Sequence, residues 1–128
     1  ALIKGDVTSG GPVLTRIHVL DPLEDVIALN PVRWGQVPNS MAAIAEAGRG
    51  AVVILCDPAP NAVSDRLRPR GASPKELRQY GVGAQIVTAL GISEMIMLTN
   101  SPAPKVVGLD GYDLTIVDTR PIPRREGI

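Results

Sequence analysis

Aromatic side chains are almost missing from this 128-residue sequence, which has no phenylalanine, one tryptophan and two tyrosines. Proteins that bind single-stranded nucleic acid stack bases on aromatic rings, and this sequence has few rings for that purpose. The chain also has no net charge, because its 13 basic residues equal its 13 acidic residues in number. There is therefore no net electrostatic field that would attract a polyanion or an anionic membrane. We therefore expect an aliphatic core and neither nucleic acid nor a membrane as partner.

Cysteine occurs once, at Cys56. A single thiol excludes an internal disulfide and any metal site built from two or more thiolates, and it suits the reducing cytoplasm. No run approaches the roughly 20 apolar residues that span a bilayer, and the first residues lack the pattern of a signal peptide. Because the chain starts at Ala1 rather than Met and leads directly into a strand-like segment, we expect residues 1–128 to be one domain of a longer cytoplasmic protein.

Apolar segments separated by turn residues predict the strands. Strands are expected over residues 1–7, 12–20, 51–56, 95–98 and 114–118. The Thr8–Gly11 turn predicts that the first two strands form a hairpin. Strands and helices alternate along the rest of the chain, which indicates the α/β class. A chain of this length with 45% hydrophobic residues is sufficient for a single compact domain.

Helix signals lie between these strands. Asp21 is placed to cap a short helix that reaches Leu29, with Pro22 in its first turn, and residues 30–39 are expected to be a loop. Ser40 is placed to cap a second helix, which Gly48 ends.

The segment from residue 57 to residue 73 has no clear period and predicts a mobile loop. Ser73-Pro74-Lys75-Glu76 then has the form of a capping box, so a helix begins there or, after two glycines, at Ala84, and Gly91 closes it. Gly81 and Gly83 lack the full signature of a phosphate-binding loop and are expected to permit tight helix packing.

Four ordered motifs stand in the second half of the chain, namely LRQYGVGAQI at 77–86, LGI at 90–92, LTNSP at 98–102 and KVVGLDGY at 105–112. Together they resemble the GTP cyclohydrolase II family of riboflavin biosynthesis. Upstream, residues 4–7, 12–18 and 44–50 match the same family in the same order. The resemblance covers nearly the whole chain, and it implies a GTP cyclohydrolase II-like fold with a mixed sheet and flanking helices.

The resemblance also implies where a metal belongs. In the family, an Arg-Val-His-Ser-Glu-Cys segment and a later Cys-Asp-Cys supply three thiolates to zinc, whose bound water attacks the guanine ring. This chain keeps Arg16-Ile17-His18 but has Asp21 at the position of the first thiolate, and no cysteine follows before Cys56. Cys56 lies outside the ligand pattern and is expected to be an inert core residue. We therefore predict that zinc is absent, with no other metal or cofactor.

A second departure concerns the Arg-Gln-Glu-Gly-Arg segment that grips the nucleotide in the family. Residues 57–62 stand there in this chain and contain neither arginine nor glycine. Without a guanidinium or a closely approaching backbone, the phosphate clamp is expected to be lost. The region from there to Arg78 is also shorter than the family usually has.

Two positions match the family's catalytic pair, Glu76 in place of an aspartate and Arg78 in place of an arginine. Glutamate keeps the carboxylate but moves it by one methylene, and a misplacement of about 1 Å costs roughly 100-fold in rate. The alternative is that Glu76 belongs to the capping box and Arg78 to a solvated helix face.

The resemblance places four residues at GTP-binding positions: Arg16, His18, Thr99 and, after a one-residue insertion, Lys105. As alternatives, Thr99 caps a turn and Lys105 is an ordinary surface lysine. A histidine is also suited to general-base chemistry, because its pKa lies near neutrality. The strand that carries His18 offers no obvious orienting partner, so the alternative is a hydrogen-bonded structural residue.

Three hypotheses about function follow from the resemblance and its departures. The first is a domain without zinc-dependent GTP hydrolysis that serves as a structural, dimerising or regulatory unit for a fused 3,4-dihydroxy-2-butanone 4-phosphate synthase, and the enzyme activity would then lie in that synthase. The second is an active GTP cyclohydrolase II that converts GTP to a diaminopyrimidine ribose phosphate, formate and pyrophosphate. The third is a sensor that binds GTP or a related nucleotide without turnover. The family precedent also suggests a homodimer.

Overall fold

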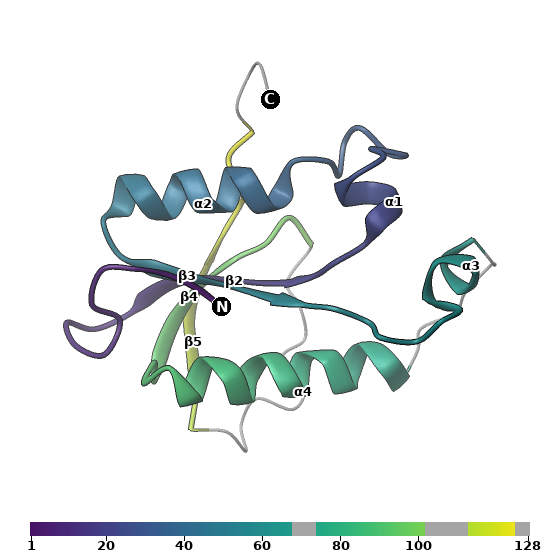
Figure 1. The fold of residues 1–128 in the computed structure, drawn as a ribbon. Coiled ribbons are helices and arrows are strands. Elements are labelled where there is room, and N and C mark those ends of the chain that lie inside the picture. Colours follow the sequence, from purple (N-terminus) through teal and green to yellow (C-terminus); the bar gives the residue numbers. More distant parts are fainter. Residues whose placement is uncertain (68–73, 102–112, 125–128) are drawn as a thin grey trace.

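The computed structural model describes residues 1–67, 74–101 and 113–124, and for residues 74–78 and 80 it describes the backbone alone. Its strands form a five-stranded sheet with helix α2 on one face and helix α4 on the other (Figure 1). In chain order the elements are β1 (Leu2–Lys4), β2 (Val13–Val19), α1 (Pro22–Asp25), α2 (Gln36–Ala47), β3 (Gly50–Leu55), α3 (Ala62–Arg66), α4 (Pro74–Ala89), β4 (Glu94–Leu98) and β5 (Thr115–Arg120). The α/β class and the mixed sheet with flanking helices are confirmed.

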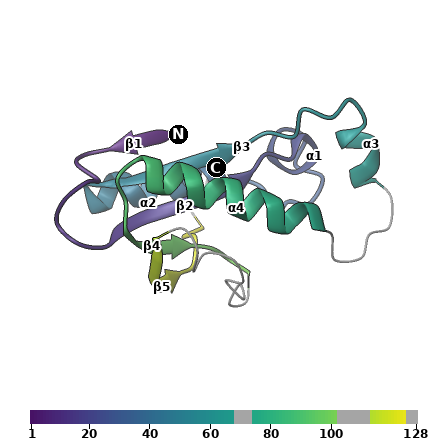
Figure 2. The same cartoon turned by 90° about the horizontal axis from the view of Figure 1, so that it is seen from below.

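The strand order is β1-β3-β2-β4-β5, so β2 is the central strand. It pairs in parallel with β3 on one side and with β4 on the other, and β5 continues the parallel part beyond β4. Only β1 among the described strands runs antiparallel, at the edge beside β3. Figure 2, turned by 90°, shows β1 and β5 at opposite margins of the sheet. The carboxyl ends of β2, β3, β4 and β5 therefore meet at one edge.

The predicted hairpin between the first two strands is wrong. Leu2 of β1 pairs with Val52 of β3, and β2 lies on the far side of β3. The reason is that β2 already has a parallel neighbour on each side, so both of its hydrogen-bonding edges are occupied. The segment between β1 and β2 has to pass β3 rather than turn back on itself.

Side-chain contacts shape that connecting segment. The Asp6 carboxylate accepts hydrogen bonds from the hydroxyl of Thr8, at 2.7 Å, and from its N–H, at 2.9 Å. The Thr8 hydroxyl contributes most, followed by a hydrogen bond from the Ser9 hydroxyl at 2.7 Å and by the Thr8 N–H, and together these bonds lower the pKa of Asp6 from 3.8 to about 2. Arg49, which precedes β3, donates to the carbonyls of Gly10 and Gly11 at 2.9 Å each. The guanidinium thus fixes the segment against the start of β3.

The short helix α1 begins as predicted. The Asp21 carboxylate accepts a hydrogen bond from the N–H of Leu23 at 3.0 Å, and Pro22 occupies the first turn. The helix ends at Asp25, four residues before the predicted end at Leu29. Proline and acidic residues favour the start of a helix, but a longer helix needs stabilisation by packing, and no residue of α1 is buried.

Helix α2 begins earlier than predicted, at Gln36, so residues 36–39 are helical rather than loop. The cap is Gly35, whose φ of 84° is a left-handed conformation that suits glycine. The predicted cap Ser40 is wrong, because its hydroxyl donates to the Gln36 carbonyl at 2.7 Å inside the helix. Pro38 is compatible with this earlier start, because a proline in the first turn removes only an N–H that has no helical partner.

Strand β3 agrees with the prediction within one residue at each end, and it follows α2 along the chain as the predicted αβ unit requires. Cys56 is exposed, so its assignment to the core is wrong. Burial along β3 already decreases at Ile54 and Leu55, and the chain leaves the sheet one residue later. The loop predicted from residue 57 contains the short helix α3, and residues 68–73 lie outside the described part.

Helix α4 is one continuous helix from Pro74, so the alternative start at Ala84 is wrong. Gly83 is buried against β2, since a Cβ atom there would lie 2.7 Å from Cγ2 of Ile17. This confirms tight helix packing as its role. Gly91 closes the helix with a φ of 87°. Within the described ranges, no helix combines the length and apolar character that crossing a membrane demands.

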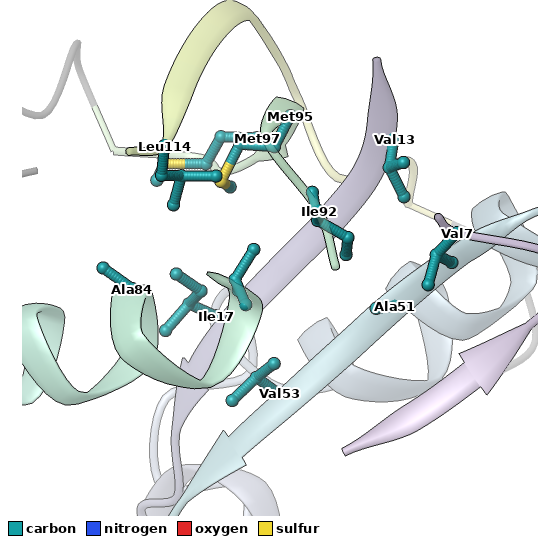
Figure 3. Close-up of a cluster of buried hydrophobic side chains, with 11 residues drawn as sticks. Val7, Val13, Ile17, Ala51, Val53, Ala84, Ile92, Met95, Met97 and Leu114 are labelled. Carbon is teal, nitrogen blue, oxygen red and sulfur yellow. The ribbon is translucent and has the colours of Figure 1, made fainter. Parts of the chain in front are cut away.

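The two faces of the sheet bury separate aliphatic clusters. Alternate residues of β2 point to opposite faces, as strand geometry requires. The cluster beneath α4 contains Val13, Ile17, Val53, Ala84, Val87 and Met95 among others (Figure 3). The cluster beneath α2 contains Leu14, Ile44, Val52, Leu98 and Ile122. Leu14 shares the α2 face with Arg16 and His18, two and four residues further along β2, so the polar residues continue the line of this second cluster.

Candidate functional site

The candidate site lies where the carboxyl ends of β2 and β4 meet. From β2 the chain passes through α2 to β3, and from β3 it returns through α4, on the other face, to β4 on the opposite side of β2. The strand that follows β2 along the chain, β3, and the strand that follows β4, β5, lie on opposite sides of the β2–β4 pair. In open α/β sheets this switch point is where ligands bind, because the diverging loops leave a crevice.

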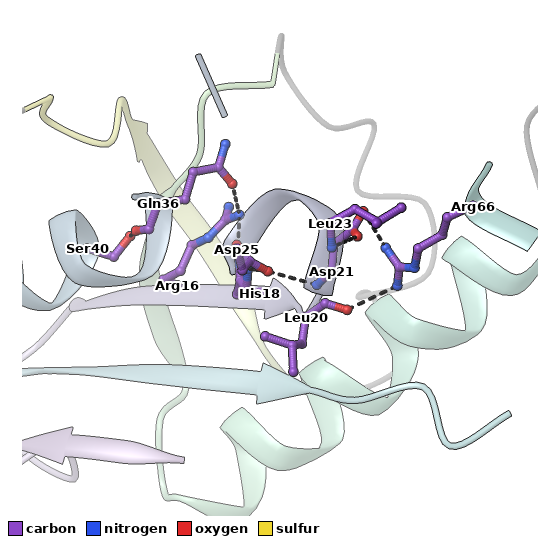
Figure 4. A network of polar contacts seen from close by, with 9 residues as sticks. All are labelled: Arg16, His18, Leu20, Asp21, Leu23, Asp25, Gln36, Ser40 and Arg66. Carbon is purple, nitrogen blue, oxygen red and sulfur yellow. Dashed lines mark hydrogen bonds and ion pairs between the residues drawn. The ribbon is translucent and has the colours of Figure 1, made fainter. Parts of the chain in front are cut away.

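Arg16 connects the elements that meet at this point (Figure 4). One terminal nitrogen donates to the carbonyl of Leu98, the last residue of β4, at 3.2 Å. The other lies 2.9 Å from Oε1 of Gln36, the first residue of α2, and 3.0 Å from Nδ1 of His18. The guanidinium is thus a half-buried link between β2, β4 and α2.

The contacts of His18 define its tautomer. A guanidinium has only N–H donors, so Nδ1 of His18 must accept the hydrogen bond from Arg16. The proton of the neutral ring then lies on Nε2, which donates to Oδ2 of Asp25 at 2.9 Å. The His18 side chain is only 6% exposed and that of Asp25 only 11%. The site therefore holds a neutral imidazole between a cation and an anion.

The surroundings of His18 also favour the neutral ring. Burial lowers the pKa of His18 below its ordinary value of 6.5, because a buried imidazolium loses its hydration. The hydrogen bond and the charge of Asp25 act in the opposite direction, and the positive charges of Arg16 and Arg33 lower the pKa further. At neutral pH the imidazole accepts and donates one hydrogen bond each.

Two aspartates hold the segment that follows β2. Oδ2 of Asp25 accepts a second hydrogen bond, from the N–H of Asp21 at 2.7 Å. Asp21 itself caps α1 through Oδ1 and forms an ion pair through Oδ2 with Arg66 of α3, at 2.8 Å. Arg66 also donates to the carbonyl of Leu20 at 3.1 Å. Helices α1 and α3 are therefore fastened to the end of β2 by side-chain contacts.

The predicted site residues are only partly brought together. Arg16 and His18 are in contact, and Thr99 directly follows the Leu98 carbonyl that Arg16 binds. The hydroxyl of Thr99 accepts a hydrogen bond from the N–H of Ser101 at 3.1 Å, a turn contact. Lys105 and the side chains of Glu76 and Arg78 lie outside the described residues. The nucleotide and catalytic roles of all these residues stay predictions.

Sequence reasoning missed the partners of Arg16 and His18. No orienting partner for His18 was obvious on its strand, and the structure supplies one from α1, because Asp25 accepts the hydrogen bond from Nε2–H. Asp25 lies seven residues further along the chain, beyond the end of β2, and neither a strand nor a helix period connects the two. Gln36 was assigned to a loop and Arg66 to a segment without structure. The only sequence signal was the presence of two aspartates soon after a strand that carries Arg and His.

Comparison with known proteins identifies the family. The family model described as GTP cyclohydrolase II matches residues 1–121. The chain belongs to the GTP cyclohydrolase II family. This confirms the resemblance that the sequence motifs indicated.

Relatives within this family are longer than the chain. A protein of Pseudomonas syringae pv. tomato named 3,4-dihydroxy-2-butanone 4-phosphate synthase is 34% identical over 135 aligned positions, which cover 96% of this chain and 36% of that protein. The riboflavin biosynthesis protein RibBA of Bacillus cereus strain ATCC 14579 is 32% identical, with 95% and 35% covered. The monofunctional riboflavin biosynthesis protein RIBA 2, chloroplastic, of Arabidopsis thaliana is 35% identical, with 95% and 28% covered. The chain thus spans about a third of the length of these curated relatives.

The residues of this GTP cyclohydrolase II family member do not fit the zinc ion that the resemblance implies. Asp21, at the position of the first thiolate, is occupied with the α1 cap and the ion pair to Arg66. Cys56 is the only cysteine of the sequence, and one thiolate is far from the three or four ligands of a zinc site. Among the described residues, no three His, Cys, Asp or Glu side chains are grouped so that they would share a metal ion.

Proposed function

We propose that this chain is a GTP cyclohydrolase II-family domain of a riboflavin biosynthesis protein that has lost zinc-dependent GTP hydrolysis. The observation that supports this proposal most is the pair of contacts that the Asp21 carboxylate makes. In place of a metal ligand, the chain has a helix cap that is paired with Arg66. The Asp21 carboxylate would have to give up both of these contacts in order to bind a metal ion.

The proposed role is structural, dimerising or regulatory, for a 3,4-dihydroxy-2-butanone 4-phosphate synthase in the same polypeptide. Support comes from the relative that carries this name and matches almost the whole of this chain over 36% of its own length. The RibBA relatives are matched over a similar fraction. In this proposal the domain acts as a homodimeric unit in the cytoplasm, and synthesis of the butanone phosphate takes place in the other unit.

Turnover of GTP tests the proposal. Concentrated protein supplemented with zinc is incubated with GTP for hours, while formate and the diaminopyrimidine product are measured. We expect turnover at least roughly 1,000-fold below that of a family member with three cysteine ligands, because a Lewis acid contributes several kcal/mol and each 1.4 kcal/mol is tenfold in rate. Such a member, assayed in parallel, is the positive control.

Two results would contradict the proposal. One is stoichiometric zinc in the purified protein, measured by metal analysis. The other is product formation that Arg78→Ala abolishes, since it would mean that the catalytic pair at Glu76 and Arg78 still works. In that case the chain is an active GTP cyclohydrolase II.

A second candidate function is nucleotide sensing, and the position of Arg16 favours it. The Arg16 guanidinium lies at the switch point of the sheet, beside His18 and near Thr99. Positively charged residues at such a position commonly bind anionic ligands. Calorimetric titration with GTP is expected to give heat that Arg16→Met removes and that Arg49→Met, at the amino end of β3, retains. A titration of the unaltered protein without heat would exclude this function.

A further inference from the structure

The hydrogen bonds around His18 leave room for only one protonation state. Nδ1 is an acceptor for Arg16 and Nε2 is a donor to Asp25. A second proton on the ring would place an N–H on Nδ1, 3.0 Å from a guanidinium nitrogen that is also a donor. Two donors and two positive charges would then face each other without an acceptor between them.

The charged groups around the ring come from three directions. Asp25 approaches from α1, Arg16 from two positions earlier on β2, and Arg33 from the segment before α2. The neighbour of His18 on β3 is Ile54, which is apolar. Protonation therefore strengthens the pair with Asp25 and repels both arginines, of which only Arg16 is in direct contact.

Displacement of Arg16 would reach beyond the ring. The same guanidinium binds the carbonyl that ends β4 and the first side chain of α2. We propose that Arg16, His18 and Asp25 form a proton-sensitive latch, which ties β4 and α2 to β2 while His18 is neutral and releases Arg16 when His18 takes up a second proton. In acid, α1 stays attached through Asp25 while the contact between β2 and β4 loosens.

The direction of the pH dependence follows from the surroundings of the ring. Since burial and the arginines hold the pKa of His18 below 6.5, the latch is closed at neutral pH and opens as the pH falls below that value. This inference does not depend on the proposed function, because it concerns the protein without ligand. The latch would be the same if this domain did hydrolyse GTP.

The single histidine of the sequence makes the latch directly measurable. In a pH titration by nitrogen-15 NMR of the unaltered protein, we expect the proton of the neutral ring on Nε2. The signals of the Thr99 backbone amide and the Gln36 side-chain amide are expected to move with the same midpoint as the imidazole. A neutral ring protonated on Nδ1, or reporter signals that stay still while the ring titrates, would overturn the proposal.

Two substitutions separate the latch from a general effect of packing. Arg16→Met removes the opposing positive charge, so the midpoint of His18 is expected to rise. Asp25→Asn keeps a hydrogen-bond acceptor but removes the negative charge, so the midpoint is expected to fall. Arg49→Met is the matched control and is expected to leave the midpoint unchanged. Shifts of the same sign in both latch variants would overturn the proposal, and if a variant does not fold, the titration of the unaltered protein decides.

Discussion

Gly50→Ala is expected to destabilise the protein by about 3 kcal/mol, at the upper end for an added methyl group in a packed core. A Cβ atom at this position would lie 2.4 Å from the carbonyl oxygen of Leu14 and 2.8 Å from Cγ2 of Ile44. The Ile44 side chain is able to rotate, but the carbonyl belongs to the central strand. Relief therefore requires β2 and β3 to move apart. Chemical denaturation monitored by circular dichroism measures the effect.

Gly83→Ala is the matched comparison. The added methyl group would lie 2.7 Å from a side-chain atom of Ile17, and none of its closest neighbours belongs to the backbone. Alanine also favours a helix over glycine by about 1 kcal/mol, so we expect a smaller loss than at Gly50. Equal losses for the two variants would contradict the argument that the backbone carbonyl makes Gly50 irreplaceable.

Asp25→Ala is expected to lower the stability by roughly 3 kcal/mol and the melting temperature by about 10 °C. The substitution leaves the Nε2–H of His18 and the N–H of Asp21 without their acceptor. Hydrogen bonds to a charged group contribute about 1.5–3 kcal/mol each, and the two are offset in part because a carboxylate no longer has to be buried. Differential scanning calorimetry at pH 7 provides the measurement.

The control for Asp25→Ala is Asp118→Ala on β5. Asp118 is 59% exposed and accepts one hydrogen bond from the N–H of Thr119, at 2.8 Å. Its ion pair with Arg120 is long, at 4.0 Å, and open to solvent. Pairs of this kind contribute about 0–1 kcal/mol, so the melting temperature is expected to change little. A loss at Asp118 as large as that at Asp25 would mean that burial of the acceptor is not what matters.

Much of the fold followed from local signals. The apolar runs of β3 and β4 and the Pro22 and Pro74 helix starts are encoded within a few residues, and the structure has all of them. Pairing of β1 was not predictable in this way. It depends on which strand has an edge free, and that is decided by the crossing of α4 to the far side of β2. The start of α2 depended on a left-handed Gly35, which no period of apolar residues indicates.

The site was less predictable than the fold. Family motifs indicated Arg16 and His18, but their partners Asp25 and Gln36 come from a helix end and a helix start whose positions the sequence did not define. The role of Asp21 was predicted only as a helix cap, and its ion pair needs Arg66 from a segment 45 residues away. Contacts between loops depend on how the sheet brings them together, and no spacing along the chain contains that information.

The central position of β2 also sets an order of assembly. Its contacts with β3 join residues about 36 apart, such as Thr15 and Ala51, whereas its contacts with β4 join residues 82 apart, such as Val13 and Met95. Closing the longer loop costs more chain entropy, so the β2–α2–β3 unit is expected to form first. Until β4 arrives, one side of β2 presents unpaired backbone groups to any other strand nearby. A polypeptide that is still being synthesised and ends before residue 94 is therefore expected to be more prone to aggregation than the folded domain.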